Sequence, residues 1–127
     1  MSDALHSRFL PERAPIDAYG NGGFRFGGMS HRGSLLCLPS GMHAWQVATY
    51  SELNAETMAQ VIAESDGIGH LLVGTGSSIH PLPMRLVEQL KAYGVNAEPM
   101  STGNASRTYN ILLGENRTVA AALIAVA

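Results

Sequence analysis

The sequence predicts a single three-layer α/β domain around a central mixed β-sheet. Helical and strand patterns alternate through the second half of the chain, and crossovers of this kind make the strands parallel through right-handed connections. The apolar run Leu71–Val73 has no polar alternation, which is typical of a strand buried on both faces of a sheet. In the first half, two strand patterns separated by a short turn predict an antiparallel hairpin.

Length, composition and charge favour one globular domain that needs no disulfide or metal to fold. The chain has 127 residues, a length typical of single domains, and its hydrophobic content of 46% suits a packed core. Only 14% of the residues are charged, so the surface has room for a further buried interface, including one in a homo-oligomer. The formal net charge of −2 gives no electrostatic case for binding nucleic acid.

The two ends of the chain show no membrane signal. Residues 1–15 lack a hydrophobic period and are predicted as a partly ordered lead-in before a single α/β domain over residues 16–127. No long apolar core follows a basic start, so no signal peptide is predicted. The apolar end Val119–Ala127 is far shorter than the roughly 20 residues that span a bilayer. We therefore expect no direct membrane insertion.

Short strands are predicted in the first half. Phe24–Phe26 alternates in strand fashion among glycines that indicate a bend, and Ser34–Leu38 and His43–Ala48 are the two strands of the hairpin. Cys37 is the single cysteine and cannot form an internal disulfide, and its apolar neighbours predict a buried thiol. Trp45 is predicted to anchor the core or an interface, with an exposed ligand platform as the alternative.

The second half is predicted to hold three helices. Asn54 is a suitable N-cap for the first helix, and Gly67 follows its end. The second helix starts at about Leu82 and ends at Gly94. Its inward-facing stripe consists of Leu82, Leu86, Leu90 and Tyr93.

The third helix is predicted over residues 103–113, with Ser101 or Thr102 as its cap. Its inner stripe consists of Ala105, Tyr109 and Leu112. Strand patterns precede and follow it at residues 95–100 and 118–126. This order of strand, helix and strand predicts parallel strands on either side of the crossover.

Two loops are predicted to face one crevice. The loops that follow Val73 and Met100 leave the same edge of a parallel sheet, so residues 74–80 and 101–110 should meet there. The second loop runs into a helix N-terminus, where free N–H groups favour an anion. The candidate ligand-binding residues are Gly74, Thr75, Gly76, Ser77, His80, Thr102, Asn104, Arg107 and Asn110.

Arg107 has two possible roles in this crevice. Its guanidinium could pair with a carboxylate or phosphate of a ligand. The alternative is that it braces the glycine loop by donating hydrogen bonds to the loop carbonyls. We favour the bracing role, under which Arg107→Ala should cost about 1–3 kcal/mol of stability.

No catalytic residue, metal or cofactor is predicted. Gly74-Thr75-Gly76 begins like a dinucleotide-binding fingerprint, but Ile79 occupies the position of the third glycine. The stretch from Gly76 resembles a nucleophile elbow only loosely, because His80 replaces its final glycine. The histidines make no helical pair at metal-ligand spacing, and one cysteine cannot supply a zinc cluster. If the crevice were catalytic, His80 would be its acid or base.

An ordered set of motifs resembles a known family. The set is Tyr19-Gly20-Asn21-Gly22-Gly23-Phe24-Arg25-Phe26, Gly33-Ser34-Leu35-Leu36, Trp45, Leu72-Val73-Gly74-Thr75-Gly76, Arg107-Thr108-Tyr109-Asn110 and Glu115-Asn116-Arg117-Thr118-Val119-Ala120-Ala121-Ala122-Leu123-Ile124. Over about residues 15–126 the chain resembles a bacterial member of the uncharacterised domain family that includes mitochondrial NADH dehydrogenase (complex I) assembly factor 3. The resemblance implies a three-layer α/β fold with a mixed sheet, and no established reaction or cofactor.

The resemblance also implies a function. The mitochondrial relatives help to assemble the respiratory NADH dehydrogenase near the inner membrane. The N-terminus carries Asp3 and Glu12 rather than an arginine-rich amphipathic helix, which favours a bacterial cytoplasmic protein. We therefore predict a non-enzymatic binding or assembly protein with protein partners, including subunits of a respiratory or other membrane complex. The alternative is a protein that binds a small anionic ligand, or an uncharacterised enzyme, with its site in the crevice.

Overall fold

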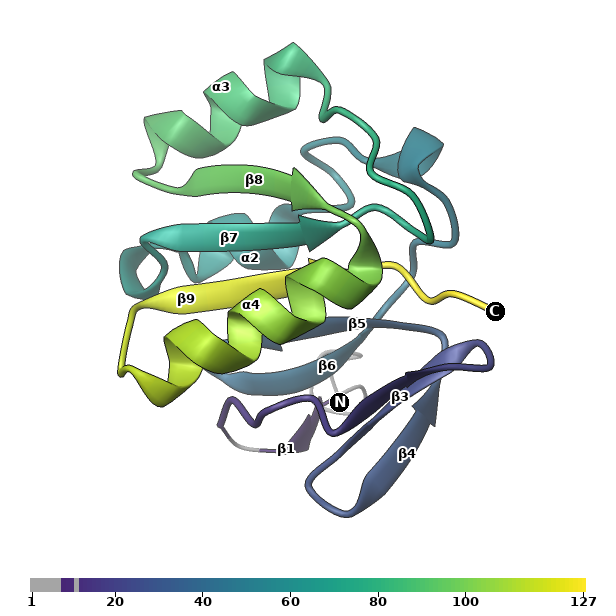
Figure 1. Ribbon diagram of the computed structural model, residues 1–127. Helices are drawn as coiled ribbons and strands as arrows, with labels where there is room; N and C mark the ends of the chain where they lie inside the picture. The colour runs from purple at the N-terminus through teal and green to yellow at the C-terminus, as the bar shows by residue number, and fades with distance from the viewer. Residues whose placement is uncertain (1–7, 11) are drawn as a thin grey trace.

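The computed structural model describes residues 8–10 and 12–127, and Figure 1 shows this part of the chain folded around one large β-sheet. Residues 1–7 and 11 of the predicted lead-in lie outside the described residues. The large sheet contains six strands in the order β1-β6-β5-β9-β7-β8, and a second sheet contains three in the order β2-β3-β4.

The elements follow the chain in a simple order. The strands are β1 (Arg8–Leu10), β2 (Ala18–Gly20), β3 (Gly23–Phe26), β4 (Met29–Arg32), β5 (Ser34–Leu38), β6 (Gly41–Trp45), β7 (His70–Gly74), β8 (Asn96–Met100) and β9 (Val119–Leu123). The α-helices are α2 (Ala59–Ala63), α3 (Met84–Ala92) and α4 (Thr102–Gly114), and the short 3-10 helices are η1 (Tyr50–Glu52) and η2 (Ser65–Gly67).

The large sheet is mixed, as the sequence predicts. Strand β7 pairs in parallel with both β8 and β9. Helix α3 connects β7 to β8, and helix α4 connects β8 to β9. Strands β5 and β6 form the predicted antiparallel hairpin. Strand β9 also pairs antiparallel with β5, so it joins the hairpin of the first half to the parallel strands of the second.

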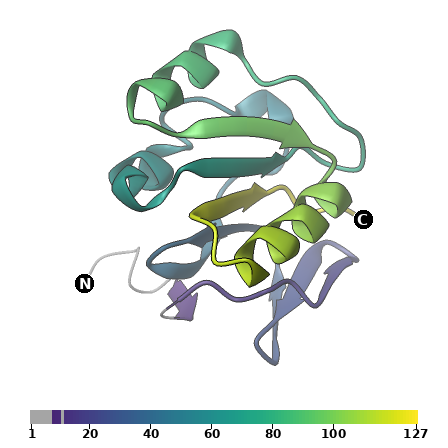
Figure 2. The same ribbon diagram turned by 60° about the vertical axis from the view of Figure 1, so that its left-hand side comes forward.

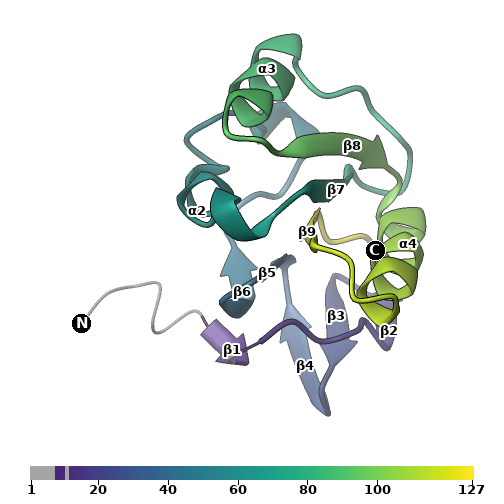
Figure 3. The ribbon, with the colours of Figure 1, turned by 90° about the vertical axis from the view of Figure 1, so that its left-hand side faces the viewer.

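The domain has three layers. Figure 3 shows α2 and α4 on opposite sides of the large sheet, and Figure 2 shows the same arrangement after a smaller turn. Helices α2 and α3 bury Val61, Leu86 and Leu90 against one face of the sheet. Helix α4 and the small sheet bury Tyr109 and Phe26 against the other face. The fold class predicted from the sequence is therefore confirmed.

The central strand shows why its sequence has no polar alternation. Successive side chains of a strand point to opposite faces of the sheet. Leu71 and Val73 belong to the core under α2 and α3, whereas Leu72 belongs to the core under α4. All three side chains are fully buried, so each face of β7 requires an apolar residue.

Several elements differ from the sequence prediction. The first helix is short because α2 begins after Met58, and the Asn54 Oδ1 caps a preceding turn by accepting a hydrogen bond from the Thr57 N–H at 2.9 Å. Tyr93 lies just beyond α3 and is 55% exposed, so it does not belong to the inner stripe of that helix. Strands β1, β2 and β4 are additional, because each is only three or four residues long and too short to show a strand period in the sequence.

Two buried side chains of the hairpin confirm their predictions. Cys37 is fully buried, and this burial raises the pKa of its thiol well above the usual range. Trp45 is 6% exposed and packs in the core below α2 and α3. Its indole Nε1 donates a hydrogen bond to the Thr57 carbonyl at 2.9 Å, so Trp45 is a core anchor and not an exposed platform.

Candidate functional site

The loops after β7 and β8 lie together at one edge of the sheet, as predicted. The Thr75 N–H donates to the Met100 carbonyl at 2.9 Å, and the Thr102 N–H donates to the Gly76 carbonyl at 2.8 Å. These reciprocal backbone bonds tie the glycine loop to the start of α4. Ser101 caps this helix, with its side-chain oxygen accepting from the Asn104 N–H.

Two buried threonine hydroxyls lock this edge. The Thr102 Oγ1 donates to the Ile124 carbonyl at 2.7 Å and accepts from the Gly76 N–H at 3.1 Å. The Thr75 Oγ1 lies 3.0 Å from the Ser78 carbonyl and accepts from the His80 N–H at 2.9 Å. Both hydroxyls are used within the fold, so neither Thr75 nor Thr102 is placed to contact a ligand.

The glycines of the loop serve close packing and a turn. A Cβ on Gly74 would lie 2.9 Å from the Thr102 Cα. The first turn of α4 can therefore pack this closely against the end of β7 only because residue 74 is a glycine. Gly76 has a φ of +120°, a conformation that L side chains rarely adopt. Gly74 therefore allows α4 to pack closely on the sheet, and Gly76 allows the turn that follows β7.

Two open grooves run along either side of α4. The β8 groove has a volume of about 490 Å³ and lies between the loop after β7, strand β8 and α4. The β2 groove has a volume of about 460 Å³ and lies between strand β2 and α4. The β8 groove is lined by Ser77, Ser78, Ile79, Glu98, Pro99, Met100, Ser101, Asn104 and Thr108. The β2 groove is lined by Ile16, Asp17, Ala18, Tyr19, Gly103, Ser106, Arg107 and Asn110.

The predicted crevice is therefore divided between these two grooves. Ser77 and Asn104 line the β8 groove, whereas Arg107 and Asn110 line the β2 groove. A spacing of three residues falls short of the 3.6-residue turn, so each step moves about 60° around the helix. Asn110 thus lies about 120° around α4 from Asn104, too far for the two side chains to share one flank.

His80 lies apart from both grooves. Its ring stacks on the Tyr50 ring, with the centroids 3.7 Å apart and the planes 11° from parallel. This contact joins the loop after β7 to η1. It gives His80 a role in holding the two loops together, which the sequence did not indicate because Tyr50 is thirty positions away.

Arg107 does not brace the glycine loop. It is exposed, and its Nη1 donates to the Asn104 Oδ1 at 3.1 Å within the same helix. Asn110 has the structural role instead, because its Oδ1 accepts from the Ile16 N–H at 2.7 Å and its Nδ2 donates to the Ile16 carbonyl at 2.8 Å. This pair of bonds fastens the segment before β2 to α4.

We expect Arg107→Ala to change the free energy of unfolding by less than about 0.5 kcal/mol, since exposed substitutions rarely do more. Asn110→Ala should cost about 1–3 kcal/mol, because both backbone groups of Ile16 lose their partner. Urea unfolding followed by circular dichroism measures both effects. If Arg107→Ala were as destabilising as Asn110→Ala, the conclusion that Arg107 does not brace the glycine loop would be wrong.

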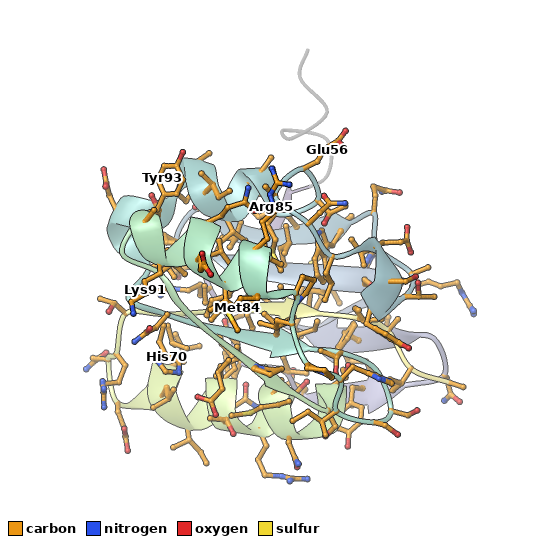
Figure 4. All side chains as sticks on the ribbon, turned by 90° about the horizontal axis from the view of Figure 1, so that it is seen from above. Glu56, His70, Met84, Arg85, Lys91 and Tyr93 are labelled. Carbon is orange, nitrogen blue, oxygen red and sulfur yellow. The ribbon has the colours of Figure 1, made fainter. Side chains whose placement is uncertain are left out.

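The charges of the grooves weaken the anionic-ligand alternative. Glu98 is the charged residue that lines the β8 groove, and its Oε1 lies within hydrogen-bonding distance of the His70 Nε2, at 3.2 Å and in an exposed position (His70 is labelled in Figure 4). Arg107 lies in the β2 groove, where Asp17 contributes the opposite charge. Sequence reasoning missed Glu98 and Asp17 as lining residues, because their positions depend on where α4 rests on the sheet.

Neither a metal site nor a membrane span is found in the part of the chain that the structure describes. Across residues 8–10 and 12–127, no three His, Cys, Asp or Glu side chains are grouped to hold a metal ion. No helix in the same residues has the length and apolar character needed to cross a membrane.

Fold and site together define a small α/β domain with open grooves beside one helix. The chain belongs to the family described as protein of unknown function (DUF498/DUF598), whose profile matches residues 16–124. It is 43% identical over 110 residues to an uncharacterized protein of Rhodobacter capsulatus, covering 87% of this chain and 83% of that protein. The family resemblance predicted from the motifs is therefore confirmed.

Several animal relatives of this chain are named for a function. The chain is 33% identical over 109 residues to NADH dehydrogenase [ubiquinone] 1 alpha subcomplex assembly factor 3 of Xenopus tropicalis. The match covers 86% of this chain and spans 60% of the length of the Xenopus protein. The assembly-factor name belongs to that longer protein.

Solved structures confirm the fold. A crystal structure of a Bartonella henselae protein, described as an outer membrane protein, is 49% identical, with a TM-score of 0.90 over 94% of this chain and 100% of that chain. A solution structure from Bordetella pertussis, described as a Mth938-like domain, is 29% identical. It has a TM-score of 0.77 over 87% of this chain and 85% of that chain.

Proposed function

We propose that this protein is a non-enzymatic binding protein that aids the assembly of a respiratory or other membrane protein complex. Its partners in this proposal are subunits of that complex before they are fully assembled. The role requires surfaces for protein contact and no catalytic group.

The observation that carries the proposal is the similarity to assembly factor 3. The match of 33% identity extends over 86% of this chain, so it covers the domain and not a short motif. The grooves on the two sides of α4 support a binding role, because they are open and are lined by both apolar and hydroxyl side chains.

We place the protein in the bacterial cytoplasm, where it would meet subunits on that side of the membrane. The similarity to a protein of the bacterium Rhodobacter capsulatus supports the bacterial part of this proposal. The Bartonella relative is described as an outer membrane protein, so cell fractionation is part of the test.

The proposal is tested in the bacterium that encodes the protein. We expect deletion of the gene to lower the amount of intact NADH dehydrogenase on native gels and to enrich subcomplexes. Re-expression of the chain should restore the intact complex. A tagged copy should fractionate with the cytoplasm and recover subunits of the complex under mild conditions.

Normal assembly in the deletion strain, with no respiratory or membrane subunit enriched on the tagged protein, would contradict the assembly role. A second respiratory complex measured in the same membranes is the control, because it separates a specific assembly defect from a general loss of membrane protein.

A further inference from the structure

The turn between β2 and β3 consists of an asparagine followed by a glycine. Gly20 pairs with Gly23, so Asn21 and Gly22 form a two-residue turn. Their φ angles are positive, at 52° and 81°, which is typical of the hairpin turn that an Asn-Gly pair favours. Asn21 is exposed to solvent. The same pair of residues is also chemically reactive, a property that the turn itself does not require.

An Asn-Gly pair can modify itself in water. The backbone nitrogen of the glycine loses its proton and attacks the asparagine Cγ, forming a new Cγ–N bond. The bond from Cγ to the side-chain nitrogen then breaks, and ammonia leaves and takes up the proton. Water opens the resulting cyclic imide at either of its two carbonyls, which gives aspartate or isoaspartate. Glycine permits the attack because it has no side chain to obstruct it.

Gly22 is held away from this reaction by two backbone hydrogen bonds. Its N–H donates to the Val126 carbonyl at 2.7 Å, and its carbonyl accepts from the Gly33 N–H at 2.7 Å. Figures 1 and 2 both show the segment after β9 beside this turn. A hydrogen bond made by the protonated form of a group opposes loss of its proton. The Val126 carbonyl therefore hinders the first step of the reaction.

The segment that carries this carbonyl lies beyond the last strand. The Ile124 N–H donates to the Gly74 carbonyl at 2.9 Å, and the Ala125 N–H donates to the Ser34 Oγ at 2.9 Å. Val126 is only partly buried. Segments with few buried contacts open locally at a small part of the free energy of global unfolding. The bond to Gly22 can therefore break while the sheet stays intact.

We propose that Asn21 is a deamidation site that the Val126 carbonyl keeps closed. When the segment after β9 leaves the turn, the Gly22 N–H is released and Asn21 converts to aspartate or isoaspartate. Isoaspartate adds a methylene to the main chain, which disturbs the pairing of Gly20 with Gly23. Both products add a negative charge. The chain thus retains a lasting chemical record of the release of this segment.

Asn116 provides a reference within the same chain. It is also exposed and has a similar φ of 59°. The N–H of the next residue, Arg117, also donates a backbone hydrogen bond, to the Leu112 carbonyl at 3.1 Å. Arg117 carries a side chain where Asn21 has a glycine beside it. A difference in reaction between the two asparagines therefore reports on that neighbour rather than on exposure or backbone conformation.

Peptide mapping by mass spectrometry during incubation in mildly alkaline buffer tests the proposal. A variant lacking residues 126–127 should convert Asn21 about twofold to tenfold faster than the parent chain, which is the range expected for the loss of one hydrogen bond. Asn116 should react more slowly than Asn21 in this variant, and at the same rate in both chains.

Two further variants serve as controls. A chain lacking Ala127 alone keeps a main-chain oxygen on Val126 and should react like the parent. Asn21→Gly suits the positive φ of the turn and should abolish conversion there. Circular dichroism spectra check that each variant is folded.

The parent chain alone gives a second measurement, which does not depend on the folding of a truncated variant. Local opening exposes little surface, so the conversion rate should change little at urea concentrations below the unfolding transition.

Either of two results would overturn the proposal. One is a variant lacking residues 126–127 that converts Asn21 no faster than the parent. The other is a parent rate that rises with urea in step with the unfolded fraction, because Asn21 would then react only through global unfolding. Neither result bears on the proposed assembly role.

Discussion

Thr102→Val is expected to lower the free energy of unfolding by about 2–4 kcal/mol, because each buried backbone group that loses its partner costs about 1–3 kcal/mol. Valine keeps the shape of threonine but cannot bond to the Ile124 carbonyl or the Gly76 N–H. Both bonds join α4 to its neighbours at the sheet edge. Urea unfolding at constant pH measures the loss, and Thr102→Ser should recover part of it by restoring the hydroxyl.

Thr108→Val is the matched control for this substitution. Thr108 lies on the same helix and lines the β8 groove, and no side-chain hydrogen bond of its own is found among the described residues. Its replacement should change stability by less than about 0.5 kcal/mol. Equal losses for the two variants would show that the Thr102 hydroxyl does not hold the edge.

Gly74→Val is expected to cost about 3 kcal/mol, which is the upper range for overpacking a filled core. The new Cβ would lie 2.9 Å from the Thr102 Cα and 3.1 Å from the Leu123 Cδ2, so the start of α4 has to move. Gly74→Ala adds the same Cβ without the further methyl groups and should cost less. Thermal unfolding gives the effect directly, since each kcal/mol corresponds to roughly 3–5 °C for a domain of this size.

Gly114→Ala provides the control for adding a Cβ. Gly114 is the last residue of α4, and a Cβ there meets nothing within 4 Å. Alanine should leave the stability unchanged or raise it by up to about 1 kcal/mol, because it favours the helix over glycine. A tolerated Gly74→Val would show that α4 can slide along the sheet, and the seating role of this glycine would be wrong.

Thr102→Val and Gly74→Val also bear on the proposed function. Both disturb the seat of α4, which forms one wall of the β8 groove and of the β2 groove. If partner subunits bind beside α4, a small shift of this helix on the sheet should lower the amount of partner subunit that a tagged copy recovers. This loss should occur even where the variant remains folded.

The sequence by itself determined the elements whose signals are local. Residues 34–38 form β5 with the predicted bounds, and the apolar run at 71–73 forms the centre of β7. Helix α4 begins after the predicted cap Ser101, and its stripe of Ala105 and Tyr109 is fully buried. Burial on two faces, a capping side chain and a helical apolar stripe each act over a few residues, so each can be recognised in the sequence.

The tertiary structure alone decided how those elements meet. Strand β4 is defined by its pairing with β3, and the stack of His80 on Tyr50 joins loops that are distant in sequence. The division of the predicted crevice depends on the rotation of α4 about its own axis, which places Arg107 beside β2 rather than above the glycine loop. That rotation is fixed by Tyr109 packing into the core and by the close approach of Thr102 to Gly74. Such contacts between distant residues have no counterpart in a local pattern, because they depend on how each helix is seated on the sheet.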